Sequence, residues 1–169
     1  MAECELLLFH STTRENLKRI MKEGIKPGMK GGWCDLWIKM LEKDFSQKSL
    51  SKEELEREKK EIDEYKKECK ELIFLSSSFH DLEEEMPPGS EIIIILCLPK
   101  RMVFIPSKKL KRYVPFEEWE EIQFGLEEKY DQVIVKEIIS PRYIIGYLDV
   151  IETIHGDPFG TKFRIGDIC

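Results

Sequence analysis

The sequence predicts a single domain of the α+β class, and three observations lead to this prediction. The chain has 169 residues, a length typical of one domain. Short apolar runs typical of strands stand between longer segments with helical periodicity. No internal repeat or low-complexity linker divides the chain. We therefore expect one domain over residues 1–169, with a helical insertion at about 33–71.

The opening of the chain predicts a strand, a tight turn and a helix. Glu5–His10 is a short apolar run with a polar end, which suits a buried strand. Thr12-Thr13-Arg14-Glu15 has the spacing of a capping box, so we expect the helix to begin at Thr12. Gly24 stands where a left-handed C-cap costs least, and Pro27 follows shortly after it.

Two further helices are expected in the insertion. After a glycine-rich link at 28–32, Trp33–Phe45 has apolar residues at helical spacing. Ser51-Lys52-Glu53-Glu54 is a second capping box and opens a charged helix that ends at about Glu71. The thin apolar face of this helix either covers an edge of the core or meets a partner protein, and its charge run is by default a solvated surface.

The rest of the chain predicts strands and one helix. Ile92-Ile93-Ile94-Ile95-Leu96 is a β-branched run typical of a central strand that is buried on both faces. Phe116–Lys129 is expected to be a helix, and the tail after His155 is rich in Gly and Asp. The expected strands are Leu72–Leu75, Glu91–Leu98, Met102–Ile105, Gln132–Val135 and Tyr143–Val150.

Composition and charge restrict the possible functions. The chain is 41% hydrophobic and 36% charged, which predicts a folded core and excludes disorder. Lys and Glu supply most of the charge, a bias seen in proteins from very hot environments, so a thermophile is our guess for the source. The net charge of -6 argues against an extended nucleic-acid footprint. One basic cluster, Lys108, Lys109, Lys111 and Arg112 beside Tyr113, is by default a solvated loop and alternatively a nucleic-acid contact.

The cysteines and histidines predict neither a disulfide framework nor a metal site. The 5 cysteines are scattered and form no C-x-x-C pair, so we expect reduced thiols and a cytoplasmic protein. The 3 histidines are widely spaced and lack paired cysteines, which argues against zinc. Acidic residues replace the basic start of a signal peptide, and no apolar run is long enough to span a membrane.

The opening segment also resembles a known motif. Leu8-Phe9-His10-Ser11-Thr12, then Asn16-Leu17 and Ile20-Met21 before Gly24-Ile25, are similar in order and spacing to the first motif of ADP-ribosyltransferases. This segment most resembles the DNA-targeting ADP-ribosyltransferase toxins of bacterial toxin–antitoxin pairs, which also carry an Asn-Leu pair early in that helix. It resembles the RNA 2′-phosphotransferases of the same fold more loosely.

Two later segments keep the order of motifs in that fold. Ile73-Phe74-Leu75-Ser76 resembles the second motif, a strand that ends near the nicotinamide. Gln132–Val135, followed by 139–144, resembles the third motif, a strand headed by the catalytic acid. The resemblance covers roughly residues 5–146. It implies an ADP-ribosyltransferase-like split β-sheet with flanking helices and NAD as the substrate.

The resemblance implies a role for each candidate residue. Cleavage of the bond between nicotinamide and ribose creates an oxocarbenium-like centre, which a carboxylate stabilises. His10 is implied to bind a ribose hydroxyl, backbone groups at Ser11 to hold the nicotinamide amide, and Phe79 to stack on the nicotinamide ring. The nucleotide is then expected between His10 and the strand that ends at Ser76. The implied NAD-binding residues are His10, Ser11, Thr12, Asn16, Ser76, Ser77 and Phe79.

One departure from the family affects the chemistry directly. Gln132 stands where the family has Glu, and an amide can bind ribose but cannot act as a base. Glu128 and Glu137 are the nearest replacement acids. Glu137 is five residues from Gln132 and on an unbroken strand faces away from it, which favours Glu128. If neither acid serves, the chain binds a nucleotide without turning it over.

Three function hypotheses stay open at this stage. The leading one is an NAD-binding ADP-ribosyltransferase-like protein, with a nucleic acid or a protein as acceptor. The second is a catalytically silent module that binds a nucleotide or ADP-ribose and meets a partner through the helix Ser51–Glu71. The third, an RNA 2′-phosphotransferase-like enzyme, requires several Arg and His groups around a phosphate, and the chain offers few. In the structural alternative, His10 is only a hydrogen-bonding residue, and Gln132 is an exposed strand residue.

Overall fold

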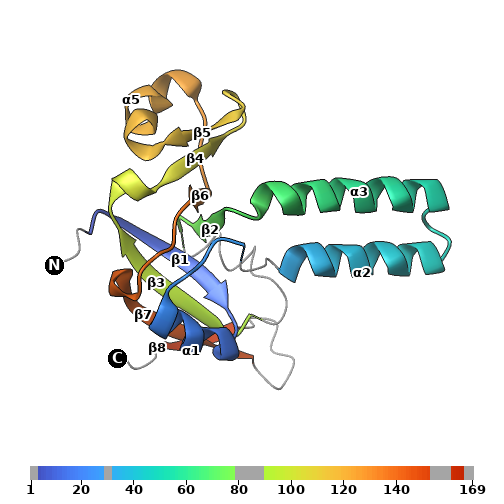
Figure 1. The fold of residues 1–169 in the computed structure, drawn as a ribbon, viewed down its shortest axis with the longest axis horizontal. Helices are drawn as coiled ribbons and strands as arrows, with labels where there is room; N and C mark the ends of the chain where they lie inside the picture. The colour runs from blue at the N-terminus through green and yellow to red at the C-terminus, as the bar shows by residue number, and fades with distance from the viewer. Residues whose placement is uncertain (1–3, 29–31, 79–89, 153–160, 166–169) are drawn as a thin grey trace.

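An eight-stranded antiparallel sheet forms the centre of the protein (Figure 1). The structure is a computed structural model that describes residues 4–28, 32–78, 90–152 and 161–165, with only the backbone described at 32–36, 151–152 and 161–165. The strand order is β5-β4-β6-β2-β1-β3-β7-β8. The strands are β1 (Leu6–Thr12), β2 (Ile73–Ser76), β3 (Ile92–Leu98), β4 (Phe104–Ser107), β5 (Arg112–Pro115), β6 (Gln132–Val135), β7 (Ile144–Glu152) and β8 (Thr161–Ile165).

Helices flank this sheet, so the predicted α+β class is confirmed. They are α1 (Arg14–Glu23), α2 (Gly32–Ser46), α3 (Lys52–Cys69), α5 (Phe116–Leu126) and the short 3-10 helices η1 (Lys100–Met102) and η2 (Pro141–Tyr143). Two strands, β5 and β8, were absent from the sequence prediction. β5 lies within the segment predicted as a basic loop, and β8 lies in the polar tail, where Gly and Asp obscured any strand signal.

The main core lies where α1 packs against the sheet. Ile20 of α1 and Ile94 of β3 are both completely buried in one apolar cluster. Ile93, the neighbour of Ile94, points to the other face and packs with Val150, Phe9 and Leu148. The prediction that β3 is a central strand buried on both faces is therefore confirmed.

The turn between β1 and α1 differs from the sequence prediction by one residue. β1 stays paired with β3 as far as Thr12, which lies opposite Ile92. This pairing holds Thr12 in the strand, so Thr13 caps the helix and accepts a hydrogen bond from the Asn16 amide at 3.3 Å. The predicted capping box beginning at Thr12 was therefore wrong, because Thr12 stays hydrogen-bonded in the ladder with β3 and does not join the helix.

Gly24 ends α1 as the sequence predicts. Its φ is +83°, and its N–H donates to the Ile20 carbonyl oxygen at 2.8 Å. A Cβ at this position would lie 2.2 Å from the carbonyl oxygen of Ile139. Glycine is required here for two reasons, since the backbone is left-handed and a second chain segment passes too close for a side chain.

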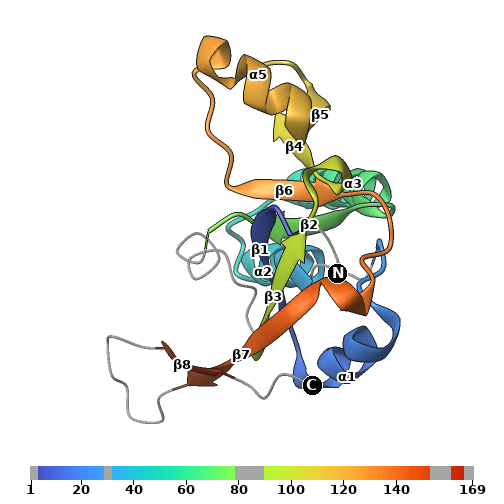
Figure 2. The same ribbon diagram turned by 90° about the vertical axis from the view of Figure 1, so that its left-hand side faces the viewer.

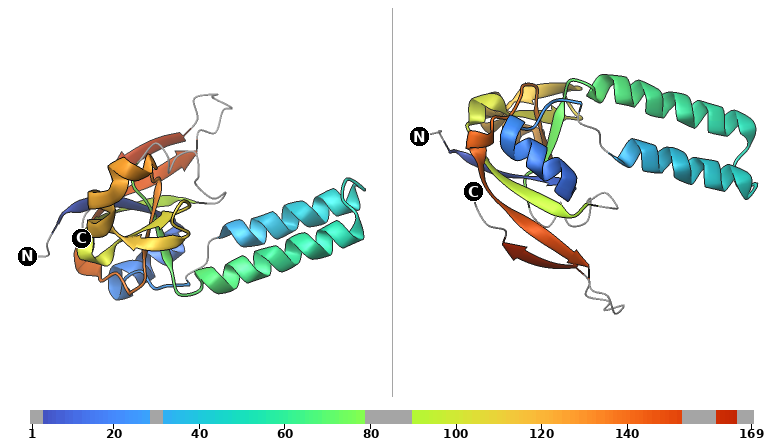
Figure 3. Two further views of the ribbon diagram at one scale, coloured as in Figure 1. Left: turned by 90° about the horizontal axis from the view of Figure 1, so that it is seen from above. Right: turned by 60° about the horizontal axis from the view of Figure 1, so that its bottom comes forward.

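Helices α2 and α3 form a hairpin that projects away from the sheet, as Figures 1 and 3 show. The predicted capping box of α3 is present, with Ser51 N donating to Glu54 at 2.9 Å and Glu54 N donating to the Ser51 hydroxyl at 3.2 Å. A small core of Leu41, Leu55 and Ile62 holds the two helices together. The thin apolar face of α3 therefore packs mainly on α2.

At the far end of the sheet, α5 packs beside the β4–β5 hairpin (Figure 2). Trp119 of α5 is almost fully buried there, and its ring meets Tyr130 edge-on, with the ring centroids 6.1 Å apart. Phe116 is also buried and meets the same tyrosine edge-on at 5.9 Å. These aromatic contacts fix the chain that leads from α5 into β6.

A disulfide joins Cys4 to Cys97 of β3 across 93 residues of sequence, with their Cα atoms 5.0 Å apart. The prediction that all thiols are reduced is therefore wrong for this pair. No local pattern in the sequence indicates this bond, because the two cysteines meet through the pairing of β1 with β3. This finding also removes the cysteine argument for a cytoplasmic location. Within the described ranges, no helix is long and apolar enough to cross a membrane.

Candidate functional site

The three predicted motif strands meet at one place in the sheet. β2 lies between β1 and β6, and Ser76 at its end is paired with Phe9 on one side and Gln132 on the other. These three residues form a row across adjacent strands. The pair Phe9–Ser76 is the only register pair between β1 and β2, whereas β2 and β6 share four. We call this weakly paired boundary between β1 and β2 the seam.

Polar side chains collect on one face of the sheet at the seam. Directly opposed residues of antiparallel strands project to the same face, so Phe9, Ser76 and Gln132 share a face. Ser11, two residues beyond Phe9, lies on that face as well. Ser76 is buried and Gln132 is exposed, so the row runs from the interior to the surface. Hydroxyl and amide groups of this kind can donate and accept hydrogen bonds.

His10 does not share this face. By strand alternation it lies on the face of its partner Ile94, so His10 and Gln132 do not point toward the same side of the sheet. The imidazole nevertheless stays at the seam, because it forms a hydrogen bond with the backbone of Phe74 in β2. The His10 ring therefore bonds to β2 at the boundary where β1 and β2 share few register pairs.

Burial favours the neutral form of the His10 imidazole. The side chain is half-buried, and desolvation lowers its pKa below the ordinary value of 6.5, while the hydrogen bond with the Phe74 backbone acts weakly in the opposite direction. A neutral imidazole has one N–H donor and one nitrogen acceptor. If the N–H bonds to Phe74, the other nitrogen can accept a hydrogen bond from a ligand hydroxyl.

Ser77 ties the ends of two strands together. Its amide and its hydroxyl both donate to the backbone carbonyl of Asp131, each at 2.9 Å. This arrangement holds the end of β2 against the start of β6. It also places the backbone of Asp131 beside the end of β2, and sequence reasoning missed this acid although it directly precedes Gln132.

The acids favoured by the sequence lie elsewhere. Glu128 accepts from the Ser107 hydroxyl and from the Lys108 amide, both at 2.7 Å, and so caps the turn between β4 and β5. The Ser107 hydrogen bond, followed by those from the turn amides, lowers the pKa of Glu128. Glu137 follows the opposite end of β6 from Gln132, roughly 16 Å along an extended chain. Neither position is in the row with Ser76.

The remaining candidates contribute less directly. Thr12 is buried, and its carbonyl accepts from the Glu91 amide at 2.9 Å. Asn16 lies in the first turn of α1, where its side-chain oxygen accepts from Arg19 at 3.1 Å. Phe79 lies outside the described residues. The structure therefore brings together His10, Ser11, Ser76, Ser77 and Gln132, and it assigns Thr12 and Asn16 to the neighbouring turn.

An arginine beside that turn joins three elements. Arg14, the first residue of α1, binds Asp149 of β7 at 2.6 Å and Glu91 at 2.8 Å. The hydrogen bond to Asp149 is the main cause that raises the pKa of Arg14. Sequence reasoning missed this cluster because its members are 77 and 135 residues apart. The cluster anchors the start of α1 to the sheet next to the seam.

The side chains of the basic cluster largely contact other residues of the protein. The Lys109 ammonium donates to the Leu126 carbonyl, and Arg112 forms an ion pair with Glu118. Lys111 has a left-handed backbone in the turn between β4 and β5. These contacts favour the default interpretation of a structural turn over that of a nucleic-acid contact.

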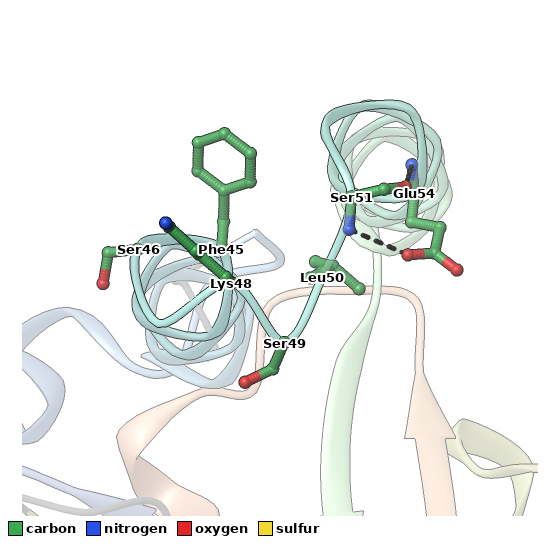
Figure 4. Close-up of a pocket in the computed structure, with 7 residues that line it drawn as sticks. All are labelled: Phe45, Ser46, Lys48, Ser49, Leu50, Ser51 and Glu54. Carbon is green, nitrogen blue, oxygen red and sulfur yellow. Dashed lines mark hydrogen bonds between the residues drawn. The ribbon is translucent and has the colours of Figure 1, made fainter.

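Two further features of the described residues lie apart from the seam or are absent from it. No group of three or more His, Cys, Asp or Glu side chains in this part of the chain could hold a metal ion. A shallow pocket lies at the tip of the α2–α3 hairpin (Figure 4). Its lining consists of the interhelical turn and the helix ends beside it, Phe45, Ser46, Lys48, Ser49, Leu50, Ser51 and Glu54.

Comparisons with known proteins leave the site to be interpreted from its own residues. No protein-family model matches the chain, and no curated protein sequence matches it significantly. Among solved structures, a chain named EcPltA aligns with a TM-score of 0.45 and 10% sequence identity. The alignment covers 95% of this chain and 82% of that chain. A TM-score and a sequence identity this low do not support an inference about function.

Proposed function

We propose that the protein binds NAD or ADP-ribose at the seam, as an ADP-ribosyltransferase-like protein. The observation that supports this proposal best is the row of Phe9, Ser76 and Gln132 across β1, β2 and β6. These residues come from the three segments whose sequences resemble the three motifs of that family. Residues this far apart in the sequence need not be neighbours in the fold, yet these three lie in one row.

The chemistry of the seam suits a ribose and a carboxamide. Ser11, Ser76 and Gln132 offer hydroxyl and amide groups on one face, and these can bond to ribose hydroxyls or to the nicotinamide amide. His10 adds a neutral imidazole at the same boundary. Phe9 at one end of the row supplies an apolar surface for a ring. Binding sites for small ligands combine such an apolar surface with a few placed polar groups.

A structure of the protein soaked with NAD tests this proposal. We expect nucleotide density against Ser76 and Gln132, with a ribose hydroxyl within hydrogen-bond distance of one of them. Density at the hairpin pocket alone, or no density at a concentration that saturates binding in solution, would contradict the assignment.

A second candidate function is a catalytically silent binding module, and Gln132 favours it. The row contains an amide where a transferase needs a carboxylate to offset the charge of the oxocarbenium centre. Gln132→Glu restores the missing acid. Because Gln132 is exposed, the new carboxylate stays hydrated and ionised near neutral pH. Release of nicotinamide by this variant, but not by the natural protein, supports a lost activity; no release by a variant that still binds NAD supports the binding module.

If the natural protein does cleave NAD, another acid must serve. Asp131 directly precedes Gln132 and its backbone is bonded to Ser77, whereas the Glu128 carboxylate caps the turn between β4 and β5. We expect nicotinamide release to fall at least about 100-fold in Asp131→Asn. Glu128→Gln is the matched control, since it removes the same charge. The opposite result would return the catalytic role to Glu128.

A further inference from the structure

Large apolar side chains are exposed on the α2–α3 hairpin at Trp37, Met40, Phe45 and Tyr65, and the first two share one flank of it. Trp37 is 49% exposed and Met40 is 56% exposed, although both belong to a helix that packs on its neighbour. They are three residues apart on α2, so they lie on the same side of it. Large apolar groups gathered on a projecting element indicate an interaction surface.

The flank can be defined by helical geometry. Successive residues of an α-helix are rotated by about 100°, and Leu41 of α2 and Ile62 of α3 mark the sides that face each other. The ion pair between Lys59 and Glu42, at 2.9 Å, lies on one flank of this contact. Trp37 and Met40 lie on the other flank.

Most charged residues on the flank of Trp37 are acidic, and Arg57, which lies close enough to Glu54 to act on its carboxylate, is at the border of this group. By the same rotation, Asp44 of α2 and Glu54, Glu58 and Glu61 of α3 share this side. No Lys or Arg of the described hairpin residues falls between them. We call this surface, made of Trp37, Met40, Asp44, Glu54, Glu58 and Glu61, the acidic-apolar face.

We propose that the acidic-apolar face binds an amphipathic helix of another protein, one whose apolar stripe is bordered by Lys and Arg. Apolar side chains of such a helix would cover Trp37 and Met40, and its cations would meet Glu58 and Glu61. A second copy of this chain is disfavoured, because pairing through this face brings two acidic surfaces together. The inference is independent of the seam, so its failure leaves the proposed function untouched.

Binding to a synthetic peptide tests the chemistry of this partner. The probe is a fluorescent helical peptide with Leu in the i, i+3, i+4, i+7 pattern and Lys on both borders, and the counter-probe has Glu in place of Lys. Fluorescence anisotropy with the full chain should show binding of the Lys peptide, with at least about 10-fold weaker binding of the Glu peptide. The double variant Trp37→Ala, Met40→Ala should weaken binding about 10-fold or more.

A matched pair of charge reversals locates the surface. Glu58→Lys with Glu61→Lys changes the acidic-apolar face, whereas Glu56→Lys with Asp63→Lys makes the same net change on the opposite flank of α3. We expect a loss of about 10-fold or more in the first variant and less than about 3-fold in the second. All four positions tolerate lysine, a good helix former, on a charged helix.

Four results would overturn the proposal. They are no binding of the Lys peptide, equal binding of both peptides, equal losses in the two charge-reversal variants, and self-association in sedimentation experiments that Trp37→Ala abolishes. The last result would identify a second copy of the chain as the occupant.

Discussion

His10 shows how burial and a single hydrogen bond determine the state of one residue. Its environment favours the neutral imidazole because desolvation outweighs the hydrogen bond to the Phe74 backbone. The sequence predicted that this residue lies at the site, but not that its ring bonds to the neighbouring strand. That contact depends on the pairing of β1 with β2, which no local pattern encodes.

We expect acid to destabilise the fold through His10. The folded pKa lies below the unfolded value of 6.5, so protons bind preferentially to the unfolded chain, and stability falls as the pH drops below about 6.5. Urea unfolding of the natural protein and of His10→Gln, between about pH 7.5 and pH 5, measures this loss. The variant should lose less stability over the range. Parallel pH profiles for the two proteins would show that another group is responsible.

Among the signals for helix and strand ends, the glycine positions gave the best predictions. Gly24 was predicted as the C-cap of α1, and its positive φ confirms this. In contrast, the capping box at the other end of α1 was misplaced by one residue, because Thr12 remains paired with Ile92. Local capping signals cannot show how far a neighbouring strand extends its ladder.

Two glycine substitutions should have opposite effects on stability. Gly24→Ala forces a Cβ to within 2.2 Å of the Ile139 carbonyl oxygen, so we expect a loss of about 2–3 kcal/mol. Gly125→Ala in α5 meets no atom within 4 Å and removes a residue of poor helix propensity, so we expect a gain of about 0.5–1 kcal/mol. Denaturant melts of the two variants measure both changes. A neutral Gly24→Ala variant would mean that the turn at Ile139 moves easily.

Only part of the candidate site could be predicted from the sequence, because local signals do not show how neighbouring strands pair. The motif order predicted that the strands of His10 and Ser76 are neighbours, and β1 does pair with β2, but it made no prediction that Ser76 lies beside Gln132. Glu128 was preferred as a replacement acid because strand alternation turns Glu137 away from Gln132, whereas the Glu128 carboxylate caps the turn beside Ser107. Asp131 was missed because nothing in the sequence shows that Ser77 holds its backbone at the seam. Residue types and spacing predicted the strands, but cross-strand hydrogen bonds determine the neighbours.

At the scale of the whole molecule, the disulfide should add substantially to stability. It joins two residues with a sequence separation of 93, and a disulfide that closes such a loop typically stabilises the folded state by about 2–4 kcal/mol. We expect a reductant to lower the free energy of unfolding of the natural protein by this amount and to leave Cys4→Ser unchanged. Mass spectrometry of the alkylated protein checks that Cys4 and Cys97 are joined. Equal stability with and without reductant would contradict a structural role for the bond.

We propose that the fold gathers three distant segments into one nucleotide site at the seam. Titration calorimetry with NAD and ADP-ribose tests it most directly, using the natural protein, His10→Ala and, as a remote control, Trp37→Ala. We expect one of the ligands to bind to the natural protein and to Trp37→Ala with equal affinity. Binding to His10→Ala should be about 10-fold weaker, since the hydrogen bond between His10 and the Phe74 backbone that joins β1 to β2 at the seam is lost. Equal affinity in all three proteins, or no binding to any of them, would contradict the claim.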